Sequence, residues 1–281
     1  MKWALRWAAV FAAMAAFRWA PGLAAMWQGR VALPVLAGLH RWSACFAFPV
    51  LEPLALGALG LGLGRRGWRR LMGAALVAAG MLALLWYPGY WARVPDQLPS
   101  PEASRLEGLC DALIDSLAPS PLRFAPAEET LSALSAKEAR YPEWMRRACI
   151  AGLFSPWTGE IIVDSGGSPA LLPFTCVHEL MHLRGIADEG EANIAAYRAC
   201  LQRGGALADS ARLWALRYAL SQLRATDAEA LGRVTARMDT VLRALVPPLE
   251  PAIPQPLFSL FGIGPATTSY PALVSYLCLE A

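Results

Sequence analysis

Two long apolar runs near the N-terminus constrain the fold of this chain more than any other feature. Residues 42–64 contain a single charge, Glu52, and residues 71–91 contain none. A helix of about 20 apolar residues crosses the hydrocarbon core of a bilayer, so both runs are long enough. Aromatic residues gather at 86–91, as in the interfacial belt of membrane proteins. We therefore predict a helical membrane region over residues 1–91, with Glu52 as an interfacial glutamate beside two prolines.

The N-terminal segment and an arginine cluster bear on how the chain sits in a membrane. An eleven-residue apolar run at 7–17 follows Lys2 and Arg6 and suits either a signal peptide or a short uncleaved helix. Because the cleavage motif beyond it is poor, we expect an uncleaved helix and about three transmembrane helices in all. Four arginines at 65–70 predict a cytoplasmic loop, which puts residues 92–281 on the extracytoplasmic side of a bacterial inner membrane.

The remainder of the chain has the mixed polarity of a domain folded in water. A proline-rich linker is predicted at 92–104 and a domain at 105–281. The stretch GEIIVD at 159–164 predicts a strand, because it is rich in β-branched residues and ends at glycines. Helical periodicity predicts amphipathic helices at about 102–118, 129–141, 188–201, 208–224 and 227–246. The expected fold class is an α-helical membrane region followed by a mainly α (α+β) domain with a small sheet.

Charge and cysteine content exclude some classes of function. The net charge of +3 is concentrated in the arginine cluster and accompanies no nucleic-acid motif, so we expect no nucleic-acid partner. The six cysteines form no CxxC pair, which argues against a zinc ribbon and a dense disulfide framework. One or two bridges among the five cysteines after residue 92 remain open. Cys176 is expected to be a small buried apolar residue rather than a metal ligand.

The segment FTCVHELMHLRGIADEGEAN at 174–193 carries the chemistry. It places His178 and His182 four residues apart around Glu179, in the pattern HExxH. On a helix these histidines share a face and can bind one zinc ion, while the glutamate lies beside the water activated by the metal as a general base. The alternative is a helix with two surface histidines, but the apolar residues around the motif predict a buried helix.

A catalytic zinc site needs a third protein ligand and an open position for water. Three acids follow the histidines after the helix stop at Gly185: Asp188, Glu189 and Glu191. We favour Glu189 as the third ligand, with Glu191 as its rival and Asp188 as a less favoured choice. Asn193 lies one turn after Glu189, where its amide is expected to support the ligands by hydrogen bonding. Each acid also suits the first turn of a helix, where it needs no metal.

At this point the motifs resemble known families. HELMH followed by EGEAN resembles the core of gluzincins such as the HtpX-like and CaaX prenyl endopeptidases, whose second motif is ExxAD. Glu189, Ala192 and Asn193 match that motif, with Asn in place of Asp. Residues 150–220 more closely resemble a family of bacterial membrane proteins catalogued only as a domain of unknown function. The resemblance implies a zincin-like metallopeptidase domain with Zn²⁺ as cofactor and no known substrate.

Together these features predict a membrane-anchored zinc metallopeptidase with a peptide or protein substrate and the lipid bilayer as its surroundings. GEIIVD would be an edge strand that pairs with the substrate. Tyr197, Arg217 and Tyr218 are candidate donors to the oxyanion, because the remaining histidine, His40, lies in the membrane half. Two alternatives are a non-catalytic zinc-binding sensor or binding domain on the same fold, and a structural membrane protein in which HELMH is coincidental.

Overall fold

The computed structural model describes residues 2–61, 67–92, 98–117, 122–148, 150–246 and 266–280. The protein is mostly helical with one small sheet, as the sequence predicts. We call residues 2–92 the apolar arm and residues 98–280 the C-terminal domain. The arm contains α1 (Lys2–Trp19), α2 (Pro21–Trp27), the π-helix η1 (Gln28–Ala32), α3 (Leu33–Ser43), α4 (Leu51–Leu61), α5 (Gly67–Leu85) and α6 (Pro88–Ala92).

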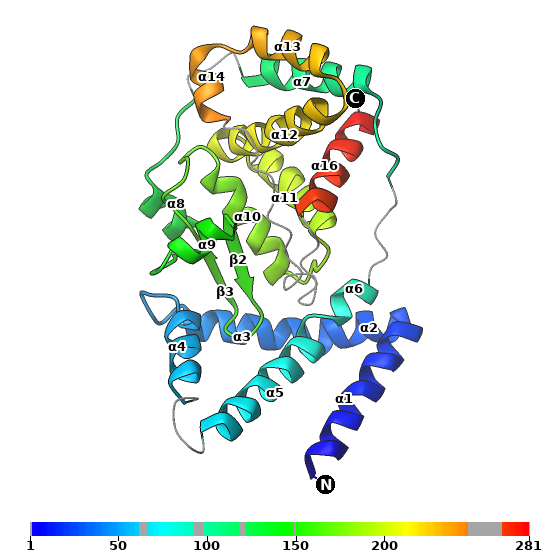
Figure 1. Ribbon diagram of the computed structural model, residues 1–281, viewed down its shortest axis with the longest axis vertical. Coiled ribbons are helices and arrows are strands. Elements are labelled where there is room, and N and C mark those ends of the chain that lie inside the picture. The colour runs from blue at the N-terminus through cyan, green and yellow to red at the C-terminus, as the bar shows by residue number, and fades with distance from the viewer. Residues whose placement is uncertain are drawn as a thin grey trace.

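The elements of the C-terminal domain surround its sheet and the predicted HExxH helix. Its helices are α7 (Ala103–Leu117), α8 (Ala127–Ala133), α9 (Glu143–Arg147), α10 (Leu172–Leu183), α11 (Glu189–Arg203), α12 (Gly205–Thr226), α13 (Ala228–Arg237), α14 (Thr240–Leu245) and α16 (Ala266–Glu280). Its strands are β1 (Lys137–Glu138), β2 (Gly152–Ser155) and β3 (Glu160–Val163). In Figure 1, α2 and α3 run along the base of this domain, and α1, α4 and α5 project away from it.

One helix in the described part of the chain is long and apolar enough to cross a membrane by itself, Arg69–Ala92. It coincides with the predicted span at 71–91. A second span is possible only if Arg6–Trp19 and Pro21–Ser43 count as one, although they are bent by 119°. The predicted run at 42–64 is not one continuous helix, because α3 ends at Ser43 and α4 begins at Leu51.

The sheet corrects one prediction about GEIIVD. Its strand order is β1-β3-β2, with β1 parallel and β2 antiparallel to β3. The strand itself is confirmed, but β3 is the middle strand and not an edge, because its four residues are buried and both sides are paired. The partner β1 lies within the helix predicted at 129–141, which ends early because the backbone at Ser135 turns through a positive φ of 54°.

The other predicted helices agree with the structure, with one break. Helices α7, α11 and α12 match three of the predicted ranges. The helix predicted at 227–246 is divided into α13 and α14, because the Asp239 side chain accepts a hydrogen bond from the Leu242 amide and begins a new helix. Five described cysteines are free thiols, and Cys149 lies outside the described residues, as do residues 93–97 of the predicted linker.

Two large apolar cores hold the molecule together, and a third, small cluster packs Met145 with Ile162. The larger one lies within the C-terminal domain and joins α7, α10, α11, α12, α13 and α16. The second core joins the arm to that domain: Leu36, Leu82 and Trp86 of the arm pack with residues of the sheet and of α10, among them Phe154 and Cys176. Because both sides contribute buried side chains, the apolar arm and the C-terminal domain form one packed unit around α10.

Two glutamates, one in the arm and one in the domain, also join these parts, because each accepts hydrogen bonds from backbone amides of the other part. Glu160 of β3 accepts hydrogen bonds from the amides of Val50 and Leu51 at 2.7 and 2.9 Å, and so holds the start of α4. Lys137 neutralises Glu160 at 2.8 Å. Glu52 of α4 in turn accepts from the amides of residues 140 and 141 at 3.1 and 3.2 Å. Glu52 is therefore buried against the C-terminal domain, and not the interfacial glutamate that its position beside two prolines suggests.

Candidate metal centre

Helix α10 presents the HExxH motif from a buried position. Pro173 stands in its first turn, where a missing N–H costs nothing, and Ser210 accepts a hydrogen bond from the Phe174 amide at 3.0 Å. The indole of Trp214 donates to the carbonyl of Leu171 at 2.8 Å. These contacts with α12 fix the start of α10. The apolar residues Cys176, Val177 and Met181 of α10 are buried, which confirms the predicted burial of this helix.

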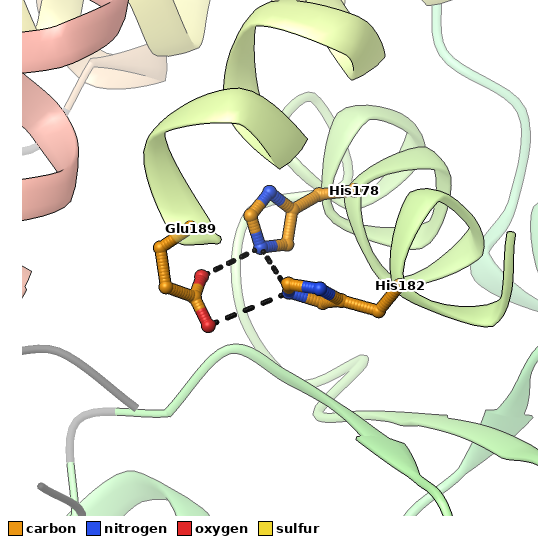
Figure 2. A group of neighbouring side chains, drawn as sticks. All are labelled: His178, His182 and Glu189. Atoms are coloured by element: carbon orange, nitrogen blue, oxygen red, sulfur yellow. Dashed lines mark hydrogen bonds and ion pairs between the residues drawn. The ribbon is translucent and has the colours of Figure 1, made fainter. Parts of the chain in front are cut away.

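The two histidines and Glu189 converge on one point, as Figure 2 shows. The Nε2 atoms of His178 and His182 are 3.1 Å apart. Glu189, the first residue of α11, places one carboxylate oxygen 3.1 Å from Nε2 of His178 and the other 3.4 Å from Nε2 of His182. One ligand atom from each of the three residues lies within 4.8 Å of the other two.

This arrangement fits a cation with nitrogen and oxygen ligands. Four ligands about 2.0–2.1 Å from a tetrahedral zinc ion are about 3.3 Å from one another, close to the separations seen here. The Nδ1 atom of His182 lies 2.6 Å from the carbonyl of Ile186, to which it can donate its proton. A neutral His182 then directs a lone pair from Nε2 toward His178 and Glu189. Three electron-pair donors that face one another are held together best by a positive ion.

A glycine turn joins the two halves of this centre. Gly185 has a φ of 88°, a conformation that glycine adopts without strain. Its amide donates to the carbonyl of His182 at 2.8 Å, and the amide of Ile186 donates to that of Met181 at 3.1 Å. These two bonds make a Schellman turn, which ends α10 and returns the chain toward the histidines. The helix stop predicted at Gly185 is therefore confirmed.

Glu179 lies beside the ligands and beneath the sheet. Its carboxyl group is buried and receives a hydrogen bond from the backbone amide of Phe154 in β2. The neighbouring strand residue, Gly152, approaches so closely that a Cβ there would lie 2.8 Å from Oε1 of Glu179. Gly152, the first residue of β2, and Glu179, the predicted base, are thus packed against each other.

Burial and charge together make the centre attract a positive charge. Burial acts to raise the pKa of Glu189, but His182 and His178 outweigh it and hold that pKa well below its usual range. Burial acts to lower the pKa of His182, but without a bound cation the Glu189 carboxylate raises it to about 9. The pKa of Glu179 is raised, because its carboxyl group is removed from water.

The other two acids proposed as third ligands have different surroundings. The Asp188 side chain accepts a hydrogen bond from the Glu191 amide at 2.9 Å and so caps α11. Glu191 stands three residues after this cap and outside the group of three converging residues. Asn193 is buried on α11, but within the described part of the chain no hydrogen bond joins it to the three ligand candidates. Its supporting role stays a prediction.

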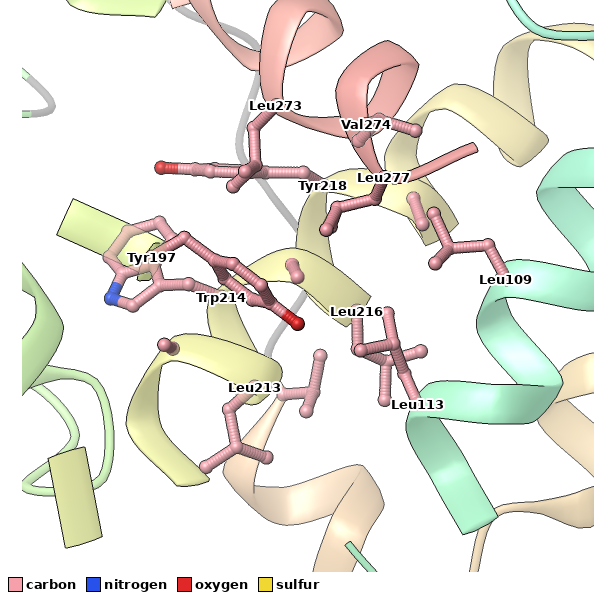
Figure 3. Packing of buried hydrophobic residues seen from close by; sticks show 14 of the residues in the cluster. Leu109, Leu113, Tyr197, Leu213, Trp214, Leu216, Tyr218, Leu273, Val274 and Leu277 are labelled. Atoms are coloured by element: carbon pink, nitrogen blue, oxygen red, sulfur yellow. The ribbon is translucent and has the colours of Figure 1, made fainter. Parts of the chain in front are cut away.

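The candidate oxyanion donors lie in or near the larger core. Figure 3 shows Tyr197, Trp214 and Tyr218 packed among leucines of α7 and α16. Arg217 lies over the ring of Trp214, 4.9 Å from its centroid. Tyr197 and Tyr218 therefore contribute to packing in this arrangement.

Sequence reasoning missed the contribution of the arm. Trp86 packs edge-on against the His182 ring with centroids 5.4 Å apart, and Tyr90 interacts electrostatically with Glu189. The predicted aromatic belt is the only sequence signal at these positions, and it points to lipid rather than to the motif nearly a hundred residues away.

One family model matches a part of the chain that includes the candidate metal centre. Residues 115–246 match a family described as "Protein of unknown function (DUF3810)". No curated protein and no solved structure matches the chain. The matched range contains the sheet, α10, α11 and all three ligand candidates, and leaves out the arm. Over that range the chain is similar to a family for which no activity is described.

Proposed function

We propose that the protein is a membrane-anchored, zinc-dependent metallopeptidase that hydrolyses peptide bonds, with its catalytic domain on the extracytoplasmic side. The observation that carries this proposal is the convergence of His178, His182 and Glu189, with the buried carboxyl group of Glu179 beside them. This set contains the ligands of a catalytic zinc site and a separate acid for proton transfer.

Each residue of the centre would have its own role in hydrolysis. A zinc ion held by the three ligands would supply a Lewis acid that lowers the pKa of water and polarises a carbonyl group. Glu179 would accept the proton of the attacking water and pass it to the leaving amine. The amide of Phe154 would hold Glu179 in place, and the buried surroundings would keep the pKa of this base raised.

The substrate would bind along β2 rather than β3. Ala151 accepts a hydrogen bond from the Asp164 amide at 3.0 Å, so in the antiparallel alternation Gly152 and Phe154 direct their backbone groups away from β3. That outer edge faces Glu179. Because the Phe154 amide already bonds to Glu179, an extended peptide would pair there with the backbone groups of Gly152 and with the Phe154 carbonyl, and this β-augmentation would bring its own carbonyls next to the metal ligands.

The arm supports the membrane part of the proposal. Large apolar side chains are exposed along its helices, where a bilayer would cover them: Phe11, Trp19, Leu54, Leu56, Met72 and Val77. Helix Arg69–Ala92 has the length and composition of a membrane span. The orientation rests on the positive-inside rule applied to the arginines at 65–70.

Two measurements on the purified full-length protein test the proposal. The wild type should carry one zinc ion, and His178→Ala should carry none. In a peptide-library assay the wild type should cleave substrates that Glu179→Gln leaves intact while it still binds zinc. If zinc is bound and both proteins leave every peptide intact, the peptidase proposal fails, and a non-catalytic zinc-binding sensor or binding domain becomes the better explanation.

A further inference from the structure

The turn between α10 and α11 determines how Glu189 meets the histidines. Within residues 184–188 the carbonyl of Ile186 orients His182, and Asp188 begins the helix that carries Glu189. A shift of this turn would therefore move one ligand and rotate another. We call residues 184–188 the ligand turn.

The apolar arm packs directly on the ligand turn. Gln28 of η1 donates a hydrogen bond from Nε2 to the carbonyl of Gly185, although 157 residues separate the two in the sequence. A Cβ on Gly89 of α6 would lie 2.9 Å from Cβ of Ala187 and 2.9 Å from Nε2 of Gln28. A Cβ on Gly185 would lie 2.7 Å from Cδ2 of Leu33. The arm and the ligand turn are thus in close contact at glycines on both sides.

Gln28 is unusual in its surroundings. It is 9% exposed and stands on a buried face of α2, η1 and α3, where its buried neighbours are Ala24, Ala32 and Leu36. A buried amide in an apolar face costs free energy unless it is hydrogen-bonded. Its bond to Gly185 meets that need, and the π-helical turn at 28–32 supplies the backbone position from which the side chain reaches the turn.

Trp86 makes a second contact between the arm and the centre. Its ring lies 5.4 Å from that of His182 and 5.4 Å from that of Phe154, measured between centroids. Phe154 is the residue whose amide holds Glu179. One indole from the arm therefore touches both a metal ligand and the strand that holds the base.

We infer that Gln28 and Trp86 are positioning residues of the metal centre, so that the apolar arm helps to set the geometry of the ligands. Gln28 holds the ligand turn through Gly185, and Trp86 fixes the plane of the His182 ring. This inference rests on the metal site of the proposed function, and it extends that site to residues outside the matched range 115–246.

Zinc affinity of the full-length protein in detergent micelles tests the inference by chelator competition. Gln28→Met and Trp86→Leu should each weaken zinc binding by about 10- to 100-fold, the loss typical of removing an outer contact of a ligand. The visible spectrum of bound Co²⁺ should also change in both. Trp86→Phe keeps an aromatic ring against His182 and should recover most of the affinity.

Trp157→Phe is the matched control. It removes another hydrogen bond between the domain and the arm, from the indole to the Ala78 carbonyl at 2.9 Å, without touching the ligand turn. Its zinc affinity should stay within about twofold of wild type. If Gln28→Met does not fold, Gln28→Ala serves in its place, because it removes the same donor and leaves space for water.

Each outcome separates this inference from the proposed function. Wild-type zinc affinity and an unchanged Co²⁺ spectrum in the Gln28 and Trp86 variants would overturn the positioning role, while peptide cleavage could still stand. An equal loss in Trp157→Phe would also overturn it, because the effect would then belong to the packing of the arm in general. If the wild type cleaves no peptide and the Gln28 and Trp86 variants bind zinc more weakly than the wild type, the positioning role is supported and the peptidase is rejected.

Discussion

The two histidines of the centre differ in how their second nitrogens are held. Nδ1 of His182 is fixed by the Ile186 carbonyl, whereas Nδ1 of His178 is buried without a hydrogen-bond partner in the described residues. A ligand histidine usually donates this proton to a partner that fixes the ring. The ring of His178 is oriented instead by its neighbours Phe174 and His182. The histidine pair is therefore asymmetric, although the motif HExxH looks symmetric.

Among the acids near the histidines, Glu189 should account for metal binding. Glu189→Gln should weaken zinc affinity by more than the about 10- to 100-fold expected for an outer contact, because a ligand itself is lost. Glu191→Gln is the matched control and should bind zinc like the wild type. Metal analysis and chelator competition measure both, and the reverse result would move the third ligand to Glu191.

Gly152 should be intolerant of any side chain. A Cβ at this position would lie 2.8 and 2.9 Å from two atoms of Glu179, so Gly152→Ala should displace the base. We expect kcat to fall by at least about tenfold, as for the loss of general base catalysis, with zinc content unchanged. Gly167→Ala is the control, because a Cβ there meets nothing within 4 Å. Equal peptidase activity in both variants would contradict this role.

At the scale of elements, local sequence predicted most of what the structure contains. Helix α10, the stop at Gly185 and the start of α11 follow from periodicity, glycine and an N-cap, which act within a few residues. The place of β3 in the sheet could not be predicted, because it depends on its pairing with Lys137 and Gly152. The contact of Gln28 with Gly185 joins segments 157 residues apart, and no local pattern encodes it.

The contact between α4 and β3 should be a main source of stability. Glu160→Ala would leave two amides at the start of α4 unpaired and would remove the carboxylate partner of the Lys137 ammonium, which keeps only its bonds to the carbonyls of Ser43 and Phe48. Breaking a buried ion pair from one side costs about 3–5 kcal/mol, so the free energy of unfolding should fall by about that amount. Denaturant unfolding in micelles measures the loss.

Glu143→Ala is the control for this stability measurement. It removes an exposed ion pair with Arg146, and its effect should stay below about 1 kcal/mol. Similar losses in both variants would mean that the contact between α4 and β3 contributes no more to the free energy of unfolding than an exposed ion pair does.

At the scale of the whole molecule, the arm contributes side chains to a core that it shares with the C-terminal domain. Leu36, Leu82 and Trp86 fill part of the core beside the sheet, so removal of the arm would expose Phe154, Ile161 and Cys176 to water. Residues 98–281 expressed alone should therefore aggregate or lose fixed tertiary packing. Size-exclusion chromatography and near-ultraviolet circular dichroism would show this. A monodisperse fragment with a native near-ultraviolet spectrum would contradict the prediction.

If α5 spans a bilayer as proposed, the bilayer itself would become part of the environment of the candidate ligands. Helix α5 has 19 residues, and Trp86 follows it directly. A helix of this length is about 28 Å long, and a tilt of about 5° around its far end would move the end that bears Trp86 by about 2.5 Å. Spanning helices change their tilt when hydrocarbon thickness changes. Through the indole against His182, the metal centre would then respond to the thickness and acyl-chain length of the surrounding lipid.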